Sequence, residues 1–463
     1  MDDERDTAHD GWATVLRWST GGDLPAASLW FEQAEADAPR ASRDPLDGDT
    51  TADVVVVGGG LTGLWTAYSL LEADPALDVL VVEGGVVGWG ASGRTGGWYG
   101  AGSPASAARL AAAHGPDAAR SARAALRDAV VEVGGVAAAE QVDCDLAVGG
   151  LLTLARTPAQ LARLTGEAAA ARAWGDEVEL LDADAVAGHA HVEGALGGTL
   201  VPDAGRLQPV RLARGLLDVL TAHGARVVEG TRALRLSPGA VVTDQGTVRA
   251  PRVVRATGAG PAAGAVHAVA TEPLPAAAWP LLGLRRGVVL RDGGHRPVRA
   301  LRTGDDRLVV SVRTGRAPAA PSGQDLGPVL RLHRALVDLL PGAAAAALTH
   351  AWGGAVTGDD RVPAVGFDAA TGLAWADGAG EDGIAAGNVA GRTVADLLTG
   401  ADTALTRLPW VGRGPLPGGG ALPPARRRGS APAAAARAVV AGFADREERL
   451  TGRPSRLGRV VGA

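Results

Sequence analysis

The sequence contains few of the residues that several classes of protein require. Among its 463 residues there is one cysteine, Cys144, so no disulfide can form within the chain and a thiolate metal cluster is excluded. No run of about 18 uninterrupted apolar residues occurs, so we predict no membrane span. The first residues are acidic and lack an apolar core, unlike a secretory signal. These absences lead us to expect a soluble cytoplasmic protein.

Cys144 itself is predicted to be structural. It lies between Asp143 and Asp145, and neighbouring carboxylates raise the pKa of a thiol. Because the thiolate is the reactive form of cysteine, we expect no reactive thiol at this position.

Lysine is absent, and isoleucine and asparagine each occur once, as Ile384 and Asn388. The abundance of alanine, glycine, arginine and valine indicates pressure toward GC-rich codons, not a physical requirement. Because that pressure has removed every other isoleucine and asparagine, the two that survive are candidates for functional residues.

The net charge of −6 is distributed unevenly. Residues 1–50 hold twelve acids and four arginines, whereas residues 413–463 hold ten arginines and three acids. The C-terminal arginines do not alternate with aromatic residues as in many nucleic-acid-binding surfaces. We therefore predict a solvated tail and no nucleic-acid partner.

A βαβ unit opens the regular structure. Four consecutive valines in Asp53–Val57 predict a strand that is buried on both faces, as in a parallel sheet. A glycine turn follows, then a helix over 61–73 and a second apolar strand over 79–82. Further along we expect helices at 105–140, 158–174, 207–223, 325–340, 389–398 and 433–450, strands at 225–231 and around 253–254, a hairpin at 244–246, an antiparallel sheet over 280–315 and two strands within 346–376.

This order predicts an α/β fold. We expect a discontinuous Rossmann-like domain on a parallel sheet, with an inserted α+β domain built on a mostly antiparallel sheet. The expected parts are an N-terminal extension (1–50), the nucleotide-binding domain (51–105, 200–262 and 355–412), the substrate domain (106–199 and 263–354), and a linker with a C-terminal helix (413–463).

The motif Gly58-x-Gly60-x-x-Gly63 follows the valine strand and opens a helix, which is the context of a dinucleotide-binding turn. The first glycine permits the tight turn, the second lets the backbone approach a pyrophosphate, and the third lets helix and strand pack closely. The helix N-terminus then offers N–H groups to phosphates. Glu83 ends the second strand, where a carboxylate accepts hydrogen bonds from ribose hydroxyls and disfavours NADP.

A second glycine-rich segment, Gly90 to Trp98, indicates that the cofactor is FAD and not NAD. A NAD domain usually continues directly to its next helix, whereas a loop with serine, arginine and glycine can run beneath a longer cofactor. Its backbone N–H groups and hydroxyls could hold the pyrophosphate and the edge of the ring.

These residues resemble a known family, the D-amino-acid-oxidase-like FAD-dependent oxidoreductases. Within it the chain is most similar to the gamma-glutamylputrescine-oxidoreductase-like branch, whose signature GASGRNGG reads here as Gly90–Gly97 with Thr95 in place of asparagine. The branch signature GYVGDGVAxxNLAGRT resembles Gly378–Thr393, with Ala379 and Glu381 as departures. The resemblance extends from about Ser28 to Gly458.

The resemblance implies FAD as the cofactor, which we expect to bind noncovalently, and it implies a role for each matching residue. The ADP half would be held by the first motif, the pyrophosphate and flavin by the glycine-rich loop, and the pyrimidine end or ribityl chain by the start of the last long helix. The implied cofactor-binding residues are Gly58, Gly60, Leu61, Thr62, Gly63, Glu83, Gly84, Ala91, Ser92, Gly93, Arg94, Thr95, Gly96, Gly97, Val228, Thr257, Gly258, Asp382, Gly383, Ile384 and Asn388.

The implied reaction is oxidation of the C–N bond of a small amine or amino acid, with O₂ or another compound as electron acceptor. Trp98 and Trp352 are the candidates for lining the substrate pocket, although either suits a plain core. No catalytic side chain is identified from the sequence. No metal site is predicted, because His189-x-His191 has no acidic third ligand.

Three alternatives stay open at this point. The departures over Arg307–Arg316 would permit a different flavin-dependent oxidation or desaturation in secondary metabolism. The changes at Ala379 and Glu381 would suit a flavin-binding protein with reduced or lost turnover. A NAD dehydrogenase is the weakest alternative, because the C-terminal signature would then have no purpose.

Overall fold

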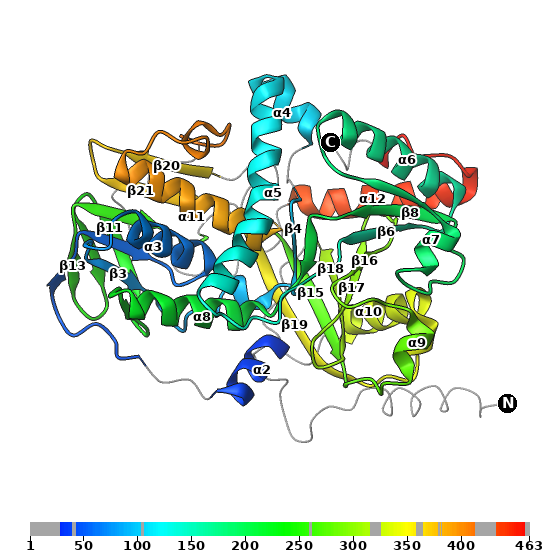
Figure 1. Ribbon diagram of the computed structural model, residues 1–463, viewed down its shortest axis with the longest axis horizontal. Helices are drawn as coiled ribbons and strands as arrows, with labels where there is room; N and C mark the ends of the chain where they lie inside the picture. The colour runs from blue at the N-terminus through cyan, green and yellow to red at the C-terminus, as the bar shows by residue number, and fades with distance from the viewer. Residues whose placement is uncertain are drawn as a thin grey trace.

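The chain folds around two large sheets (Figure 1), and its α/β fold is the predicted one. The computed structural model describes residues 28–38, 43–102, 106–258, 262–314, 326–357, 364–377, 380, 382–412 and 432–458. Within them no helix is both long and apolar enough to cross a membrane.

The first sheet has six strands, which are parallel except for its last pair. All residues of its two central valine-rich strands are buried, as a sheet covered on both faces requires. In spatial order the strands are β10 (Arg226–Val228), β3 (Val79–Val82), β2 (Val54–Val57), β14 (Arg252–Arg255), β21 (Leu373–Asp377) and β20 (Ala364–Asp368).

Helices cover one face of this sheet, and a small sheet covers the other. The helices are α3 (Leu61–Ala73), α5 (Pro116–Ala139), α8 (Pro209–Ala222) and α11 (Gly383–Thr399), with α4 (Ala107–His114) before α5. The small sheet contains β1 (Thr50–Thr51), β13 (Thr247–Arg249), β12 (Ala240–Thr243) and β11 (Ala233–Ser237).

The second large sheet has eight strands and is antiparallel except between β16 and β6. One face packs on α9 (Ala278–Leu282) and α10 (Leu326–Leu339), and the other faces the nucleotide-binding part. Its strands in order are β19 (Leu348–Thr357), β15 (Ala262–Thr271), β18 (Leu308–Thr314), β17 (Val298–Arg302), β16 (Val289–Arg291), β6 (Leu151–Ala155), β8 (Gly197–Val201) and β7 (Glu179–Asp182).

The remaining elements are short or peripheral. A three-stranded sheet of β4 (Trp98–Gly100), β9 (Ala204–Arg206) and β5 (Ala147–Val148) lies between the two large ones. The others are α2 (Leu29–Asp37), α6 (Pro158–Ala173), α7 (Ala183–Ala187), α12 (Pro432–Thr451), and the 3-10 helices η1 (Ser92–Arg94), η2 (Pro341–Ala343) and η3 (Leu405–Arg407).

Helices α3 and α11 approach each other closely because two glycines of α11 face α3. A Cβ on Gly387 would lie 3.0 Å from Oγ1 of Thr62, and a Cβ on Gly391 would lie 2.7 Å from the backbone nitrogen of Thr66. The pairing advances along both helices in the same direction, so their N-termini lie at the same end. Since α3 follows β2 directly, that end is the carboxyl edge of the six-stranded sheet.

The structure corrects two predictions of secondary structure, the start of the last long helix and the strands within 346–376. The last long helix begins at Gly383 and not at residue 389, because Gly387 is required by the contact with α3 and does not end the helix. Helix α5, which lies within residues 106–199, shares the hydrophobic core of the six-stranded sheet. Residues 346–376 form three strands in two sheets, and not two strands.

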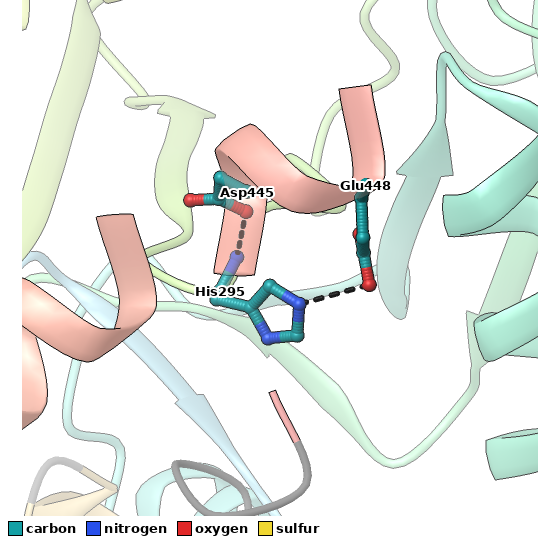
Figure 2. Close-up of side chains that lie close together, drawn as sticks. All are labelled: His295, Asp445 and Glu448. Atoms are coloured by element: carbon teal, nitrogen blue, oxygen red, sulfur yellow. Dashed lines mark hydrogen bonds and ion pairs between the residues drawn. The ribbon is translucent and has the colours of Figure 1, made fainter. Parts of the chain in front are cut away.

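A cluster of His295, Asp445 and Glu448 attaches helix α12 to the turn between β16 and β17 (Figure 2). The His295 backbone N–H donates to Asp445 at 2.9 Å, and its Nε2 lies 2.9 Å from Oε1 of Glu448. Oε1 also accepts from Arg163 at 3.4 Å and from the backbone of Ser455 at 3.1 Å. These hydrogen bonds explain the cluster without a metal ion.

Replacing Gly391 by alanine should destabilise the fold, because the new methyl group would force α11 away from the backbone of α3. We expect a loss of about 1–3 kcal/mol, as for other overpacked sites. Gly166 in α6 is the matched control, since nothing lies within 4 Å of a Cβ there. The Gly166→Ala variant should gain about 0.5–1 kcal/mol. Equal unfolding midpoints for the two variants in urea would contradict the close packing.

Candidate cofactor site

The turn between β2 and α3 has no room for side chains. Gly58 has φ +113°, and a Cβ there would lie 2.6 Å from the carbonyl oxygen of Ala256. A Cβ on Gly63 would lie 2.0 Å from the carbonyl oxygen of Gly58. Helix α3 begins at Leu61, whose N–H donates to Oγ of Ser92 at 3.0 Å. The turn therefore brings a helix N-terminus and the glycine-rich loop together.

Glu83 is held at the end of β3 by backbone groups. Its carboxylate accepts the N–H of Gly59 at 2.7 Å and the N–H of Gly85 at 2.8 Å. Burial raises the pKa of Glu83, although these hydrogen bonds oppose the shift. The backbone N–H of Glu83 donates to the carbonyl of Val228 at 3.0 Å, so the ends of β3 and β10 meet here.

The segments that follow β3 and β14 also reach this edge. Gly84 lies against Arg232, and Cα of Thr257 would lie 3.3 Å from a Cβ on Gly58. Gly258 follows Thr257 with φ +61°. The structure thus places the residues predicted to hold the ADP half around one turn.

Residues 90–97, the glycine-rich loop, pack tightly between the nucleotide-binding part and the eight-stranded sheet. A Cβ on Gly96 would lie 2.6 Å from Oγ of Ser311, and a Cβ on Gly97 would lie 2.5 Å from the ring of Trp30. The guanidinium of Arg94 lies 4.8 Å from the ring centroid of Trp89. Ala91 precedes the 3-10 turn η1, which contains the predicted Ser92 and Gly93.

The N-terminus of α11 carries the third group of predicted residues. Asp382 is its N-cap position, Gly383 its first residue, and Ile384 is buried in the core. Asn388 lies one turn further and is fully buried. Neither its amide nitrogen nor its oxygen has a hydrogen-bond partner among the residues that the structure describes. The departures Ala379 and Glu381 lie outside the described residues, as do residues 315 and 316.

These features fit FAD. The glycine turn has the shape of a pyrophosphate cradle, Glu83 is a half-buried carboxylate that can accept hydrogen bonds from ribose hydroxyls, and two helix N-termini face the same edge. A buried amide without partners is costly, by about 1–3 kcal/mol, unless a ligand completes its hydrogen bonds. The unpartnered Asn388 is therefore the observation that most directly indicates an absent polar ligand.

Trp98 and Trp352 both lie next to the glycine-rich loop and are almost completely buried. Nε1 of Trp352 donates to the carbonyl of Thr95 at 3.2 Å, so this side chain supports the loop. Trp98 stacks on Arg299, whose guanidinium lies 4.1 Å from the ring centroid.

The remaining candidates from the sequence are Cys144, His189 and His191. Burial, with help from Asp143, raises the pKa of Cys144 to about 11, as expected for a structural thiol. His191 contacts the carbonyl of Leu281 at 3.1 Å, and His189 and His191 belong to no potential metal group of the described residues.

Sequence reasoning did not identify the contribution of α2. Its Trp30 donates Nε1 to the carbonyl of Thr95 at 2.9 Å, and Ser28, its N-cap, donates to the carbonyl of Gly93 at 2.5 Å. The available signal was the apolar run Leu29-Trp30-Phe31 within an otherwise polar segment.

Comparison with known proteins agrees with this geometry. Residues 53–397 match the family described as FAD dependent oxidoreductase. The chain belongs to this family, and FAD is its cofactor. The predicted resemblance and the prediction of an FAD-dependent enzyme are confirmed.

Two relatives in sequence are similar to this chain. Gamma-glutamylputrescine oxidoreductase of Escherichia coli is 32% identical over 220 residues, which are 46% of this chain and 50% of that protein. The match therefore spans half of that relative. The probable oxidoreductase OrdL of Rhizobium meliloti is 28% identical over 412 residues, 84% of this chain and 92% of its own.

The fold also matches solved structures. Glycine oxidase of Bacillus cereus superposes with a TM-score of 0.62 at 18% identity, covering 77% of this chain and 97% of that one. At this identity the likeness establishes the shared fold of the two chains.

Replacing Asn388 by leucine should have opposite effects on the apoprotein and on cofactor binding. The apoprotein should melt at a higher temperature, because an unpartnered buried amide is removed. FAD affinity should fall, because the amide no longer completes its hydrogen bonds to the cofactor. Thermal melts of apoprotein and fluorescence titration with FAD measure the two effects.

The control for Asn388→Leu is Thr393→Val in the same helix. The hydroxyl of Thr393 already donates to the carbonyl of Val389 at 2.7 Å, so its loss should not raise the melting temperature. Unchanged FAD affinity in Asn388→Leu would contradict the assignment.

FAD affinity should also decrease with falling pH. Ionised Glu83 is the better acceptor for ribose hydroxyls, and protonation removes part of that capacity. Because burial raises its pKa, affinity is lost at a higher pH than an ordinary glutamate would give. FAD titrations between about pH 5 and pH 8 test this against Glu83→Gln, which should bind more weakly and lose the pH dependence. If FAD affinity depended on pH in the same way in both proteins, Glu83 would not be the acceptor for the ribose hydroxyls.

Proposed function

We propose that this chain oxidises the C–N bond of a small amine or amino acid. Noncovalently bound FAD would supply the acceptor chemistry: flavin N5 would accept a hydride from the carbon beside nitrogen, and water would hydrolyse the imine that remains. The protein's own residues position the two reactants and set the polarity of the site. Relatives named for an amine and for an amino acid, gamma-glutamylputrescine and glycine, support this choice of substrate.

The observation that carries the proposal is the direct contact between the eight-stranded sheet and the glycine-rich loop. Trp352 of β19 bonds to Thr95, and Ser311 of β18 leaves no space for a side chain on Gly96. A Cβ on Gly354 of β19 would lie 2.9 Å from Cβ of Arg94. A substrate held by this face of the sheet would therefore lie over the loop that supports the cofactor.

Charge on this face favours the proposed substrates. Arg299 pairs with Ser311 across β17 and β18, so their side chains share the face that contacts the loop. Its buried guanidinium, stacked on Trp98, would attract a carboxylate and would disfavour a second positive charge nearby. The amine would therefore bind more readily as the neutral base, whose lone pair assists loss of hydride.

The helix α11 contributes to the same step. Its N-terminus carries a partial positive charge, about half an elementary charge, at the edge of the cofactor site. That charge stabilises negative charge near the helix end, where Asn388 is also placed. This charge would lower the free energy of a reduced flavin that carries negative charge.

The proposal is tested by mixing the holoprotein anaerobically with a panel of amines and amino acids. We expect the visible flavin absorption to bleach with at least one of them, at a rate that rises with pH as the amine loses its proton. Re-admission of O₂, or addition of a dye as acceptor, should restore the absorption. A flavin that binds but is bleached by no amine, yet is bleached by dithionite, would refute amine oxidation and leave FAD binding intact.

A further inference from the structure

We propose that helix α2 holds the glycine-rich loop in the conformation that binds FAD, and that Trp30 is the positioning residue. This inference rests on the FAD site and not on the identity of the substrate. The helix precedes residue 53, where the match to the family model begins.

Helix α2 acts on the peptide bond between Thr95 and Gly96. The carbonyl of Thr95 accepts two indole N–H groups, from Trp30 at 2.9 Å and from Trp352 at 3.2 Å. The two rings lie edge to face, with centroids 5.8 Å apart, so they support each other. Two donors on one carbonyl fix the rotation of the plane between Thr95 and Gly96.

The orientation of that peptide plane determines the direction of the Gly96 N–H. In a trans peptide the N–H of Gly96 points away from the carbonyl of Thr95, and the described chain has no cis peptide bond. The N–H of Gly96 is therefore directed away from the two indoles. We assign this N–H as a donor to the bound cofactor.

A glycine-rich loop needs such a restraint more than other segments do. Residues 90–97 contain four glycines, which have more backbone freedom than any other residue type. Ordering such a loop during binding costs conformational entropy, whereas a loop already ordered in the apoprotein binds more tightly. Ser28 adds a second restraint by donating to the carbonyl of Gly93.

Helix α2 is itself attached to both halves of the molecule. Gln208, the N-cap of α8, donates to the carbonyl of Trp30 at 2.6 Å, and Arg214 donates to the carbonyl of Ala34 at 2.7 Å. On the other side Glu32 lies 2.8 Å from Nε2 of His350 in β19. Figure 1 shows α2 beside α8 and β19, at the junction of the two parts. Helix α2 is therefore held in place by hydrogen bonds to both parts of the molecule.

The test compares Trp30→Phe with Trp410→Phe. Phenylalanine keeps an aromatic ring but removes the N–H, so packing is largely preserved. Trp410 is as deeply buried as Trp30, and its Nε1 has no partner in the described chain, so it controls for the loss of the larger ring. FAD affinity of each apoprotein is measured by fluorescence titration without substrate, together with its melting temperature.

We expect Trp30→Phe to weaken FAD binding by about two- to tenfold, the range for loss of one hydrogen bond. Trp410→Phe should stay within about twofold of the parent protein. Adding Trp352→Phe to Trp30→Phe should weaken binding further and should speed hydrogen exchange in the peptide that covers residues 90–97 of the apoprotein.

Ser28→Ala is the milder variant if Trp30→Phe folds poorly, and it should shift FAD affinity in the same direction. Two results would overturn the proposal. One is parental FAD affinity in Trp30→Phe, or in Ser28→Ala where Trp30→Phe cannot be measured. The other is an equal loss of affinity in Trp410→Phe, which would show general loosening of the core. Failure of amine oxidation affects neither comparison.

Discussion

The contact between helices α3 and α11 is the constraint on which the cofactor site depends. Gly387 and Gly391 bring the backbone of α11 against Thr62 and Thr66 with no side chain between them. This contact places both helix N-termini at the carboxyl edge of the same parallel sheet, where their partial positive charges add. In the arrangement we propose, one N-terminus would face the pyrophosphate and the other the flavin. A side chain at either glycine would separate the two groups of residues that must hold one ligand.

The sequence predicted the βαβ unit accurately because its signals are local. A valine run, a glycine turn and the spacing to Glu83 all belong to about thirty consecutive residues, and each has a direct backbone explanation. The start of α11 was placed too late because glycine within an alanine-rich segment suggests a helix end, whereas Gly387 is there for a tertiary contact. The position of α5 could not be predicted, since its apolar face would suit either domain.

The role of α2 was also missed, because its contacts are distant in the sequence. Ser28 and Trp30 act on residues 65 positions further along the chain, and nothing near them indicates a partner. The residues of the glycine-rich loop were predicted from their own motif, whereas the hydrogen bonds that restrain the loop come from Ser28 and Trp30, far away in the sequence. The site therefore combines motifs that are recognisable in the sequence with tertiary contacts, such as those of α2, that only the structure reveals.

The glycine turn, the glycine-rich loop and Asn388 should together hold one FAD, and the visible spectrum of the purified protein is the measurement that tests this. We expect the two absorption bands of oxidised flavin, with one FAD per chain released into the supernatant by acid precipitation. A colourless protein that takes up no added FAD would contradict it, because the turn, the loop and Asn388 would then have no common ligand.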